Sequence, residues 1–241
     1  MAKRTDSGFP GFPKEALRFL RQLKKNNNRE WFQANKSVYE TKVRGPMVEL
    51  LMALQPHLRR IAPEIPYDPR KAIFRIYRDI RFSADKSPYK THISAFLAPK
   101  LPSGCTSAGL YLHVDPGQAL IAGGLYHAPA PELLAVRQHI ARHFKTMRKI
   151  LAAPEFRKSF ESLEGDELSR VPRGFPSDHP AADLLRHKDF VVSATHPPQI
   201  SETPEFFDLL LKHFGAMMPL IRFVNAALQK MPKKFPLEEE F

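Results

Sequence analysis

The spacing of apolar residues along the chain is the feature that most restricts its fold. Near the start, Leu17, Leu20 and Leu23 recur at three-residue intervals, which is typical of a helix face turned toward a core. Within residues 72–126 there are instead segments in which apolar and polar residues alternate, as they do in strands. Helical spacing returns from Pro131 onward. The sequence therefore predicts an α+β fold, with a central antiparallel sheet flanked by N-terminal and C-terminal helices.

Three helices are expected before the sheet. The first begins after Phe12-Pro13 and ends at Asn26-Asn27-Asn28, where Asn28 can cap the second helix. The second runs to about Arg44, and Gly45-Pro46 either kinks it or starts a third. The apolar residues expected to be buried in that third segment are Val48, Leu51, Leu54 and Leu58.

Strands are predicted in the middle of the chain and once more near its end. In the first of them, Phe74 and Ile76 should share one face, with Arg75 and Tyr77 on the other. A turn at Asp115–Gln118 has proline second and glycine third, as in a type II turn. The predicted strands cover Ala72–Arg78, Thr91–Leu97, Gly109–Val114, Gln118–Tyr126 and Asp189–Thr195.

Helices are expected again in the second half. One starts at Pro131 and carries a core stripe through Leu151. A short helix should follow Asp178 and end at Leu185, with Asp178 as its cap or, alternatively, as the carboxylate that orients His179 as a base. A last long helix should start at Thr203-Pro204-Glu205 and be disturbed near Pro219. The first of these helices should present a basic face away from its stripe, made of Arg137, Arg142, Lys145, Arg148 and Lys149.

Length and composition favour a single α+β domain over residues 12–231, with a flexible N-terminus at 1–11 and a C-terminal tail at 232–241. No apolar run approaches the roughly 18 residues of a membrane span, so no membrane association is expected. The residues after Met1 lack the apolar region of a secretory signal, and Cys105 is the only cysteine. These features predict a cytoplasmic protein.

Positive charge is concentrated near the middle of the chain. The formal net charge is +12, and residues 70–90 contain seven Lys or Arg but only two Asp. Guanidinium groups can grip two oxygens of a phosphate or carboxylate, so the excess predicts a site for an anionic small ligand. The residues predicted to bind that ligand are Arg75, Arg78, Arg81, Asp85, Lys86, Tyr89 and Lys90.

Other functions remain open at this point. Asp79 or His179 would be the general base if the site is catalytic, but the sequence does not decide whether the protein is an enzyme, and it indicates no cofactor. The basic cluster and the basic helix face could instead bind nucleic acid, which we consider less favoured because no reading motif is present. Alternatively, Asp79 and Asp85 could pair with neighbouring arginines in a purely structural ion-pair network. The oligomeric state is not indicated.

Four weaker motifs have plain structural interpretations. His139 and His143 have the spacing of two metal ligands on a helix but lack an obvious third ligand, so no metal site is predicted. Cys105 lies in a Ser/Gly loop without a neighbouring base. Gly123-Gly124 is typical of a bulge or of close packing in a strand, although it would also let a ligand approach. Arg29 and Glu30 fit helix capping and surface pairing.

The central cluster also carries a resemblance. The order Arg75-x-x-Arg78-Asp79-x-Arg81-Phe82-x-x-Asp85-Lys86-x-x-Tyr89 resembles the signature of a bacterial family of conserved hypothetical proteins, domain of unknown function 2461. The resemblance extends over nearly the whole chain and implies no particular reaction, substrate or catalytic residue. Further segments that resemble the family are Asn28–Phe32 with Lys36 and Tyr39, Gly123–Tyr126, Gly174-Phe175, Asp178–Ala181, Asp183–Leu185, and Pro219-Leu220 with Asn225.

Overall fold

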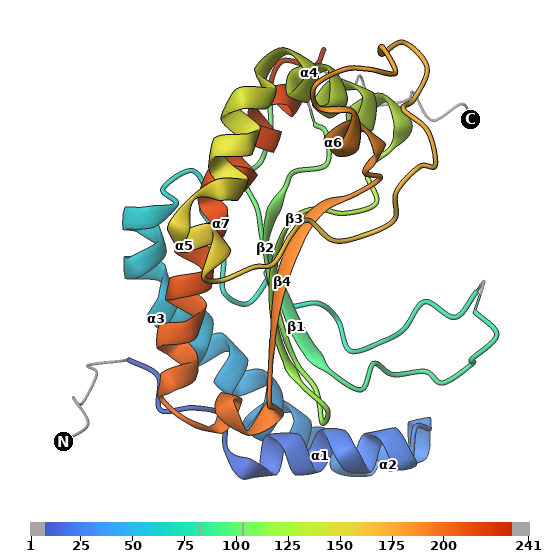
Figure 1. Cartoon of the computed structure of the whole chain (residues 1–241). Helices are drawn as coiled ribbons and strands as arrows, with labels where there is room; N and C mark the ends of the chain where they lie inside the picture. Colours follow the sequence, from blue (N-terminus) through green and yellow to red (C-terminus); the bar gives the residue numbers. More distant parts are fainter. Residues whose placement is uncertain (1–7, 82, 103, 233–241) are drawn as a thin grey trace. The chain divides into compact units, whose positions relative to one another are not determined.

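The fold is α+β, as predicted. The computed structural model describes residues 8–81, 83–102 and 104–232. Four strands form one antiparallel sheet of order β1-β2-β3-β4, with helices before and after it in the sequence (Figure 1). The described chain divides into two compact units, one made of residues 8–97, 111–121 and 194–215 and the other of residues 98–110, 122–193 and 216–232.

The helices before the sheet follow the predicted boundaries closely. Helix α1 covers Lys14–Lys25 and α2 covers Arg29–Val38. Asn28 caps α2, since its side-chain oxygen accepts a hydrogen bond of 2.9 Å from the amide of Trp31. A π-helical segment, η1 (Tyr39–Arg44), then leads without a break into α3 (Gly45–Ile61). Pro46 lies in the first turn of α3, directly after the π-helical segment.

These helices supply a large part of the core of their unit. In α3, Leu51, Leu54 and Leu58 are buried as predicted, whereas Val48 is only half-buried. Phe9, which lies in the segment predicted as a flexible N-terminus, is 1% exposed. Residues 1–7 of that segment and residues 233–241 of the predicted tail lie outside the described residues.

The sheet contains β1 (Ile93–Leu97), β2 (Gly109–Val114), β3 (Ala119–Leu125) and β4 (Phe190–His196). All four correspond to predicted strands, and the loop between β1 and β2 was also expected. The turn between β2 and β3 is different from the prediction. Gly117 does not have the positive φ that a type II turn requires. Instead, the Asp115 carboxylate accepts hydrogen bonds from the amides of Gly117 and Gln118 and closes the turn.

The strand predicted for Ala72–Arg78 is wrong. This segment forms only two isolated antiparallel bridges, from Ile73 to Ala95 and from Tyr77 to Tyr89. The two bridges are thus four residues apart in segment 73–77 but six residues apart in segment 89–95. The additional residues of the second segment interrupt a regular ladder. The interruption also breaks the alternation, because Ile76 is buried while Phe74 is 43% exposed.

The remaining helices are α4 (Ala130–Ala152), α5 (Pro154–Arg157), α6 (Ala182–Arg186), the 3₁₀ segment η2 (Pro198–Glu202) and α7 (Glu205–Leu228). Helix α4 is kinked at His143, and Pro219 lies inside α7. Asp178 was expected to cap the short helix, but that helix begins at Ala182, so Asp178 is not its cap. Within the described ranges, no helix is both long and apolar enough to cross a membrane.

Gly123 and Gly124 confirm the close packing predicted for them. A Cβ atom on Gly123 would lie 2.2 Å from the sulfur of Met217, and one on Gly124 would lie 2.0 Å from the carbonyl oxygen of Phe190. Gly124 also has a φ of +128°, which other residues rarely adopt. Gly124 therefore requires glycine for steric reasons, whereas a Cβ atom at Gly123 would require the Met217 side chain to move.

Candidate functional site

Residues 72–81 and 83–92 form an extended arm that leads into β1 (Figure 1). Its two sides are held together by backbone hydrogen bonds that run from Phe74 to Ser94, from Arg78 to Pro88 and from Lys90 to Ile76, at 2.7–2.9 Å. The arm carries all seven predicted ligand-binding residues and Asp79. Phe82 of the signature lies outside the described residues.

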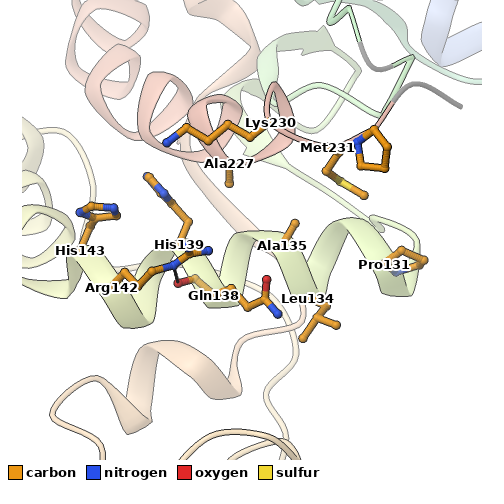
Figure 2. Close-up of a pocket in the computed structure, with 11 residues that line it drawn as sticks. Pro131, Leu134, Ala135, Gln138, His139, Arg142, His143, Ala227, Lys230 and Met231 are labelled. Carbon is orange, nitrogen blue, oxygen red and sulfur yellow. Dashed lines mark hydrogen bonds between the residues drawn. The ribbon is translucent and has the colours of Figure 1, made fainter.

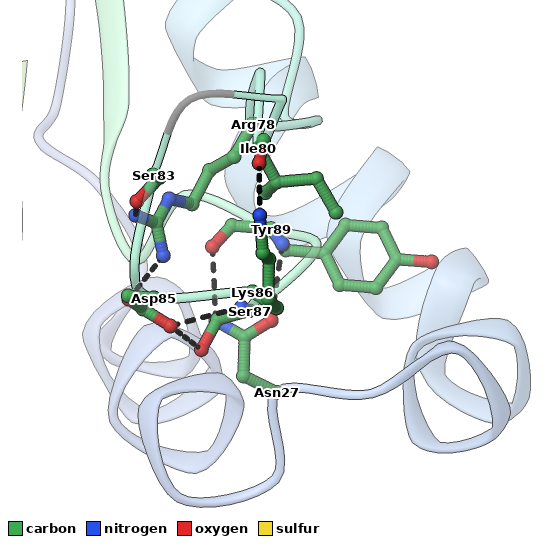
Figure 3. Close-up of polar contacts among 8 residues, drawn as sticks. All are labelled: Asn27, Arg78, Ile80, Ser83, Asp85, Lys86, Ser87 and Tyr89. Carbon is green, nitrogen blue, oxygen red and sulfur yellow. Dashed lines mark hydrogen bonds and ion pairs between the residues drawn. The ribbon is translucent and has the colours of Figure 1, made fainter.

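Arg78 and Asp85 form an ion pair across the arm (Figure 3). Arg78 also donates to the hydroxyl of Ser83, while Asp85 accepts hydrogen bonds from the amide and the hydroxyl of Ser87 at 2.9 and 2.6 Å. The hydroxyl and the amide of Ser87, followed by Arg78, lower the pKa of Asp85 to about 2. The guanidinium of Arg78 is therefore already matched by internal oxygens.

A second ion pair joins Arg81 to Asp79. Two nitrogens of the guanidinium donate to the two carboxylate oxygens at 3.1 and 2.8 Å, and both side chains are exposed. Hydrogen bonds from the Arg81 side chain and amide lower the pKa of Asp79 to about 2. A carboxylate with so low a pKa is a weak proton acceptor at neutral pH, which disfavours Asp79 as a general base.

Lys86 and Tyr89 also have partners inside this unit. The Lys86 ammonium donates to the carbonyl oxygen of Ile80 at 3.0 Å. Tyr89 is 2% exposed, and its ring stacks on Phe32 of α2 with centroids 4.1 Å apart. The side-chain amide of Asn27 forms hydrogen bonds with both the N–H and the carbonyl oxygen of Tyr89 (Figure 3). In this arrangement Tyr89 anchors the arm to the N-terminal helices.

Arg75 and Lys90 are less closely matched by carboxylates, although the positive charge of Arg75 contributes to lowering the pKa of Asp79. Among the described residues, neither forms an ion pair, and Arg75 is exposed. The Lys90 ammonium lies 5.0 Å from the centroid of the Phe74 ring. Burial lowers the pKa of Lys90, and the positive charge of Arg75 lowers it further, so the two cations lie close enough to repel each other. An anion near both would relieve that repulsion.

A polar cluster that the sequence analysis missed lies on the sheet beside Lys90. The Tyr111 hydroxyl and Nδ1 of His113 are 3.1 Å apart, and Nε2 of His113 lies 3.3 Å from the Asp115 carboxylate. A neutral His113 with its proton on Nε2 satisfies these two contacts, with Tyr111 donating to Nδ1, whereas the contact of Nε2 with the side-chain nitrogen of Gln118 at 3.2 Å requires Nε2 to accept. The ring of His92 lies 5.1 Å from that of His113.

The environment lowers the pKa of both imidazoles. Burial, followed by the charges of His113 and Lys90, lowers the pKa of His92 to about 4. Burial also lowers the pKa of His113, although Asp115 acts in the opposite direction. The spacing 111, 113, 115 was the available signal, because residues two apart on a strand lie on the same face. A carboxylate, an imidazole and a hydroxyl in line can transfer a proton.

His179 lies in the other unit, apart from this cluster in the sequence and in its contacts. Its Nδ1 accepts a hydrogen bond of 3.0 Å from the amide of Ala181, and its ring packs against Phe144. Within the described ranges, no hydrogen bond or ion pair joins it to Asp178. The contacts of His179 thus fit a structural role at the start of α6.

The predicted basic face of α4 is only partly present. Arg137 is 8% exposed, which contradicts its placement on the surface, and it donates to the carbonyl oxygen of His187 at 2.8 Å. Arg148 is paired with Asp183 at 2.7 Å. Arg142, Lys145 and Lys149 are exposed. Fewer cations are therefore available for nucleic acid than the sequence suggested.

Cys105 is buried, and its sulfur lies 3.6 Å from the sulfur of Met231. Burial of this kind does not expose a thiol for nucleophilic chemistry. His139 and His143 lie in a cavity of the second unit, and no group of three metal-ligating side chains occurs within the described residues.

Comparison with known proteins places the chain in a family. Residues 15–223 match the conserved hypothetical protein family DUF2461, which is most of the 241 residues. No curated protein matches the chain, and no solved structure does. The match confirms the expected resemblance, and the chain belongs to the conserved hypothetical protein family DUF2461.

Proposed function

We propose that the protein binds an anionic small ligand, carrying a phosphate or a carboxylate, through Arg75 and Lys90 at the base of the arm. The observation that supports this is the proximity of two cations for which no described carboxylate forms an ion pair. Arg78, Arg81 and Lys86 are left out of the proposal as direct ligands, because internal oxygens already match them. Their contacts support a structural role that shapes the arm.

The neighbouring cluster gives the proposal a chemical setting. Lys90 is close enough to His92 to lower its pKa, and His92 packs against His113. A ligand held by Arg75 and Lys90 would lie beside the Tyr111–His113–Asp115 chain, which could move a proton to or from it. The proposed function is ligand binding alone, and proton transfer by this cluster is a separate step that can be tested. The single buried cysteine fits a cytoplasmic location for such a protein.

The experiment is a calorimetric titration with inorganic phosphate, inorganic pyrophosphate and citrate at low ionic strength. In the double variant Arg75→Gln/Lys90→Gln, the affinity of the binding event assigned to the arm should fall by at least about tenfold, since both charges are removed from that site. The matched control is Lys145→Gln/Lys149→Gln, which changes the net charge equally on an exposed face of α4. An equal loss in both double variants would show nonspecific attraction and would contradict the proposal, as would the absence of binding in the unmodified protein.

Nucleic acid binding is tested in the same series. Binding of a short DNA or RNA duplex that falls steeply with salt, and that Lys145→Gln/Lys149→Gln weakens more than Arg75→Gln/Lys90→Gln, would favour the alternative function.

A further inference from the structure

A cavity of about 320 Å³ lies between α4 and the end of α7, in the second unit. That volume is at the lower end of the range of small-ligand pockets. Its apolar wall includes Leu134, Ala135, Ala227 and Met231. The cavity shares no residue with the arm or with the cluster around His113, so it is a separate site.

The polar side chains that line the cavity are mostly cationic or able to become so. His139 and His143 lie one turn apart on α4 with ring centroids 4.6 Å apart, and Lys230 follows the end of α7. Figure 2 shows the two imidazoles and the Lys230 ammonium on the same side of the cavity. Arg142 also lines it and uses Nε to donate to the backbone oxygen of Gln138 at 3.1 Å. No Asp or Glu lines the cavity among the described residues.

Aromatic packing holds the central imidazole in place. The ring of His139 lies 4.6 Å from the ring of Phe223 on α7, on the side of α4 that faces the cavity. His143 stands at the kink of α4. Two imidazoles, a guanidinium and an ammonium thus surround one hollow with an apolar wall.

The charges favour an anion rather than a metal ion. Burial lowers the pKa of His139, and the positive charges of His143, Lys230 and Arg142 lower it further. Those same charges would repel a metal cation, and the described residues supply no third ligand beside the two imidazoles. A negative group would instead reduce the mutual repulsion of all four side chains.

We propose that this cavity is a second binding site for a small molecule with a phosphate or carboxylate group, held by Arg142, Lys230 and the protonated imidazoles of His139 and His143. The apolar wall gives the ligand's carbon skeleton a place to pack. The site is independent of the one proposed at Arg75 and Lys90.

The test follows the imidazole resonances by NMR while inorganic phosphate is added to the full chain, with His139→Gln and His143→Gln used for assignment. Bound phosphate should raise the pKa of His139, because an anion stabilises the protonated ring. In the double variant Arg142→Gln/Lys230→Gln, at least about ten times more phosphate should be needed to produce the same rise in the pKa of His139. Arg75→Gln/Lys90→Gln should leave it unchanged, which separates this site from the proposed function at the arm.

The same spectra test the alternatives. If phosphate leaves both imidazole pKa values unchanged, the proposal is overturned. A parallel titration with ZnCl₂ alone covers the metal alternative: zinc that shifts both resonances at micromolar concentration, and that is unaffected by phosphate, would assign the cavity to a metal instead. A shift that persists in Arg142→Gln/Lys230→Gln would also contradict the assigned residues.

Discussion

The side-chain amide of Asn27 pairs with the backbone of Tyr89 in the way that one strand pairs with another. The amide nitrogen donates to the carbonyl oxygen of Tyr89 at 2.9 Å, and the amide oxygen accepts from its N–H at 3.0 Å. The two residues are 62 positions apart in the chain. This contact joins the turn between α1 and α2 to the base of the arm.

Replacing Asn27 with Ala should therefore destabilise the protein. Both backbone groups of Tyr89, which are partly shielded from water, would lose their partner, at a cost of about 1–3 kcal/mol. Urea denaturation measures the effect. Asn26→Ala is the control, since the side chain of Asn26 donates to the carbonyl oxygen of Gln22 in its own helix, and it should change the free energy of unfolding by roughly 0.5 kcal/mol or less. Equal effects in the two variants would contradict the anchoring role of Asn27.

The folded arm should become less stable at acidic pH. Because Ser87 and Arg78 lower the pKa of Asp85 to about 2, its carboxylate stabilises the folded arm above the unfolded pKa near 4. That contribution should be lost as the pH falls from about 4 to about 2. Limited proteolysis by pepsin over this range should show cleavage in the arm that rises toward pH 2. Asp85→Asn should raise the cleavage at pH 4 to the low-pH level, and unchanged cleavage in this variant would argue against the pair.

A histidine pair should make global stability fall in mild acid. The Nε2 atoms of His196 and His213 are 3.1 Å apart. Burial, His196 and Lys212 lower the pKa of His213 to about 4, and burial and Lys212 also lower the pKa of His196. In the unfolded chain these imidazoles bind protons near pH 6.5, whereas in the folded chain they do not. The free energy of unfolding should therefore be unaffected by this pair above pH 6.5 and should decrease from there down to about pH 4.

Thermal unfolding at several pH values measures that decrease. His213→Gln should flatten the dependence between pH 6.5 and pH 4. Lys212→Gln should flatten it partly, because removal of the neighbouring charge raises both imidazole pKa values. A slope that is the same in all three proteins would assign the acid sensitivity to other groups, such as His92.

Gly124, the second glycine of the Gly123-Gly124 pair, should not tolerate a larger residue. A Cβ there meets the carbonyl oxygen of Phe190 and a positive φ together, so Gly124→Ala should cost about 1–3 kcal/mol or more. Gly104→Ala is the matched control, because Gly104 also has a positive φ but has no atom within 4 Å of an added Cβ. It should cost only about 1 kcal/mol. Chemical denaturation compares them, and similar costs would mean that backbone strain alone explains Gly124.

Local sequence determined the helices and most strands of this protein. The spacing of Leu17, Leu20 and Leu23 specifies α1, and Asn28 caps α2 with its own side chain, because both effects act within one or two turns of chain. The segment 72–78 has the alternation of a strand, yet whether it forms one depends on residues 89–95, whose extra residues break the ladder. That mismatch is invisible in the segment itself.

The sequence predicted only part of the candidate site. The sequence located the positive charge, but counting acids could not show that Lys86 would bond to a backbone carbonyl or that Arg78 would find the hydroxyl of Ser83. It also placed Arg137 on the surface, whereas the folded chain buries it against the backbone of His187. The amino-acid sequence fixed where charges and periodicities occur along the chain. Only the tertiary structure decided which of them meet, since partners such as Asn27 and Tyr89, or His92 and His113, are set by distances in space that no local pattern encodes.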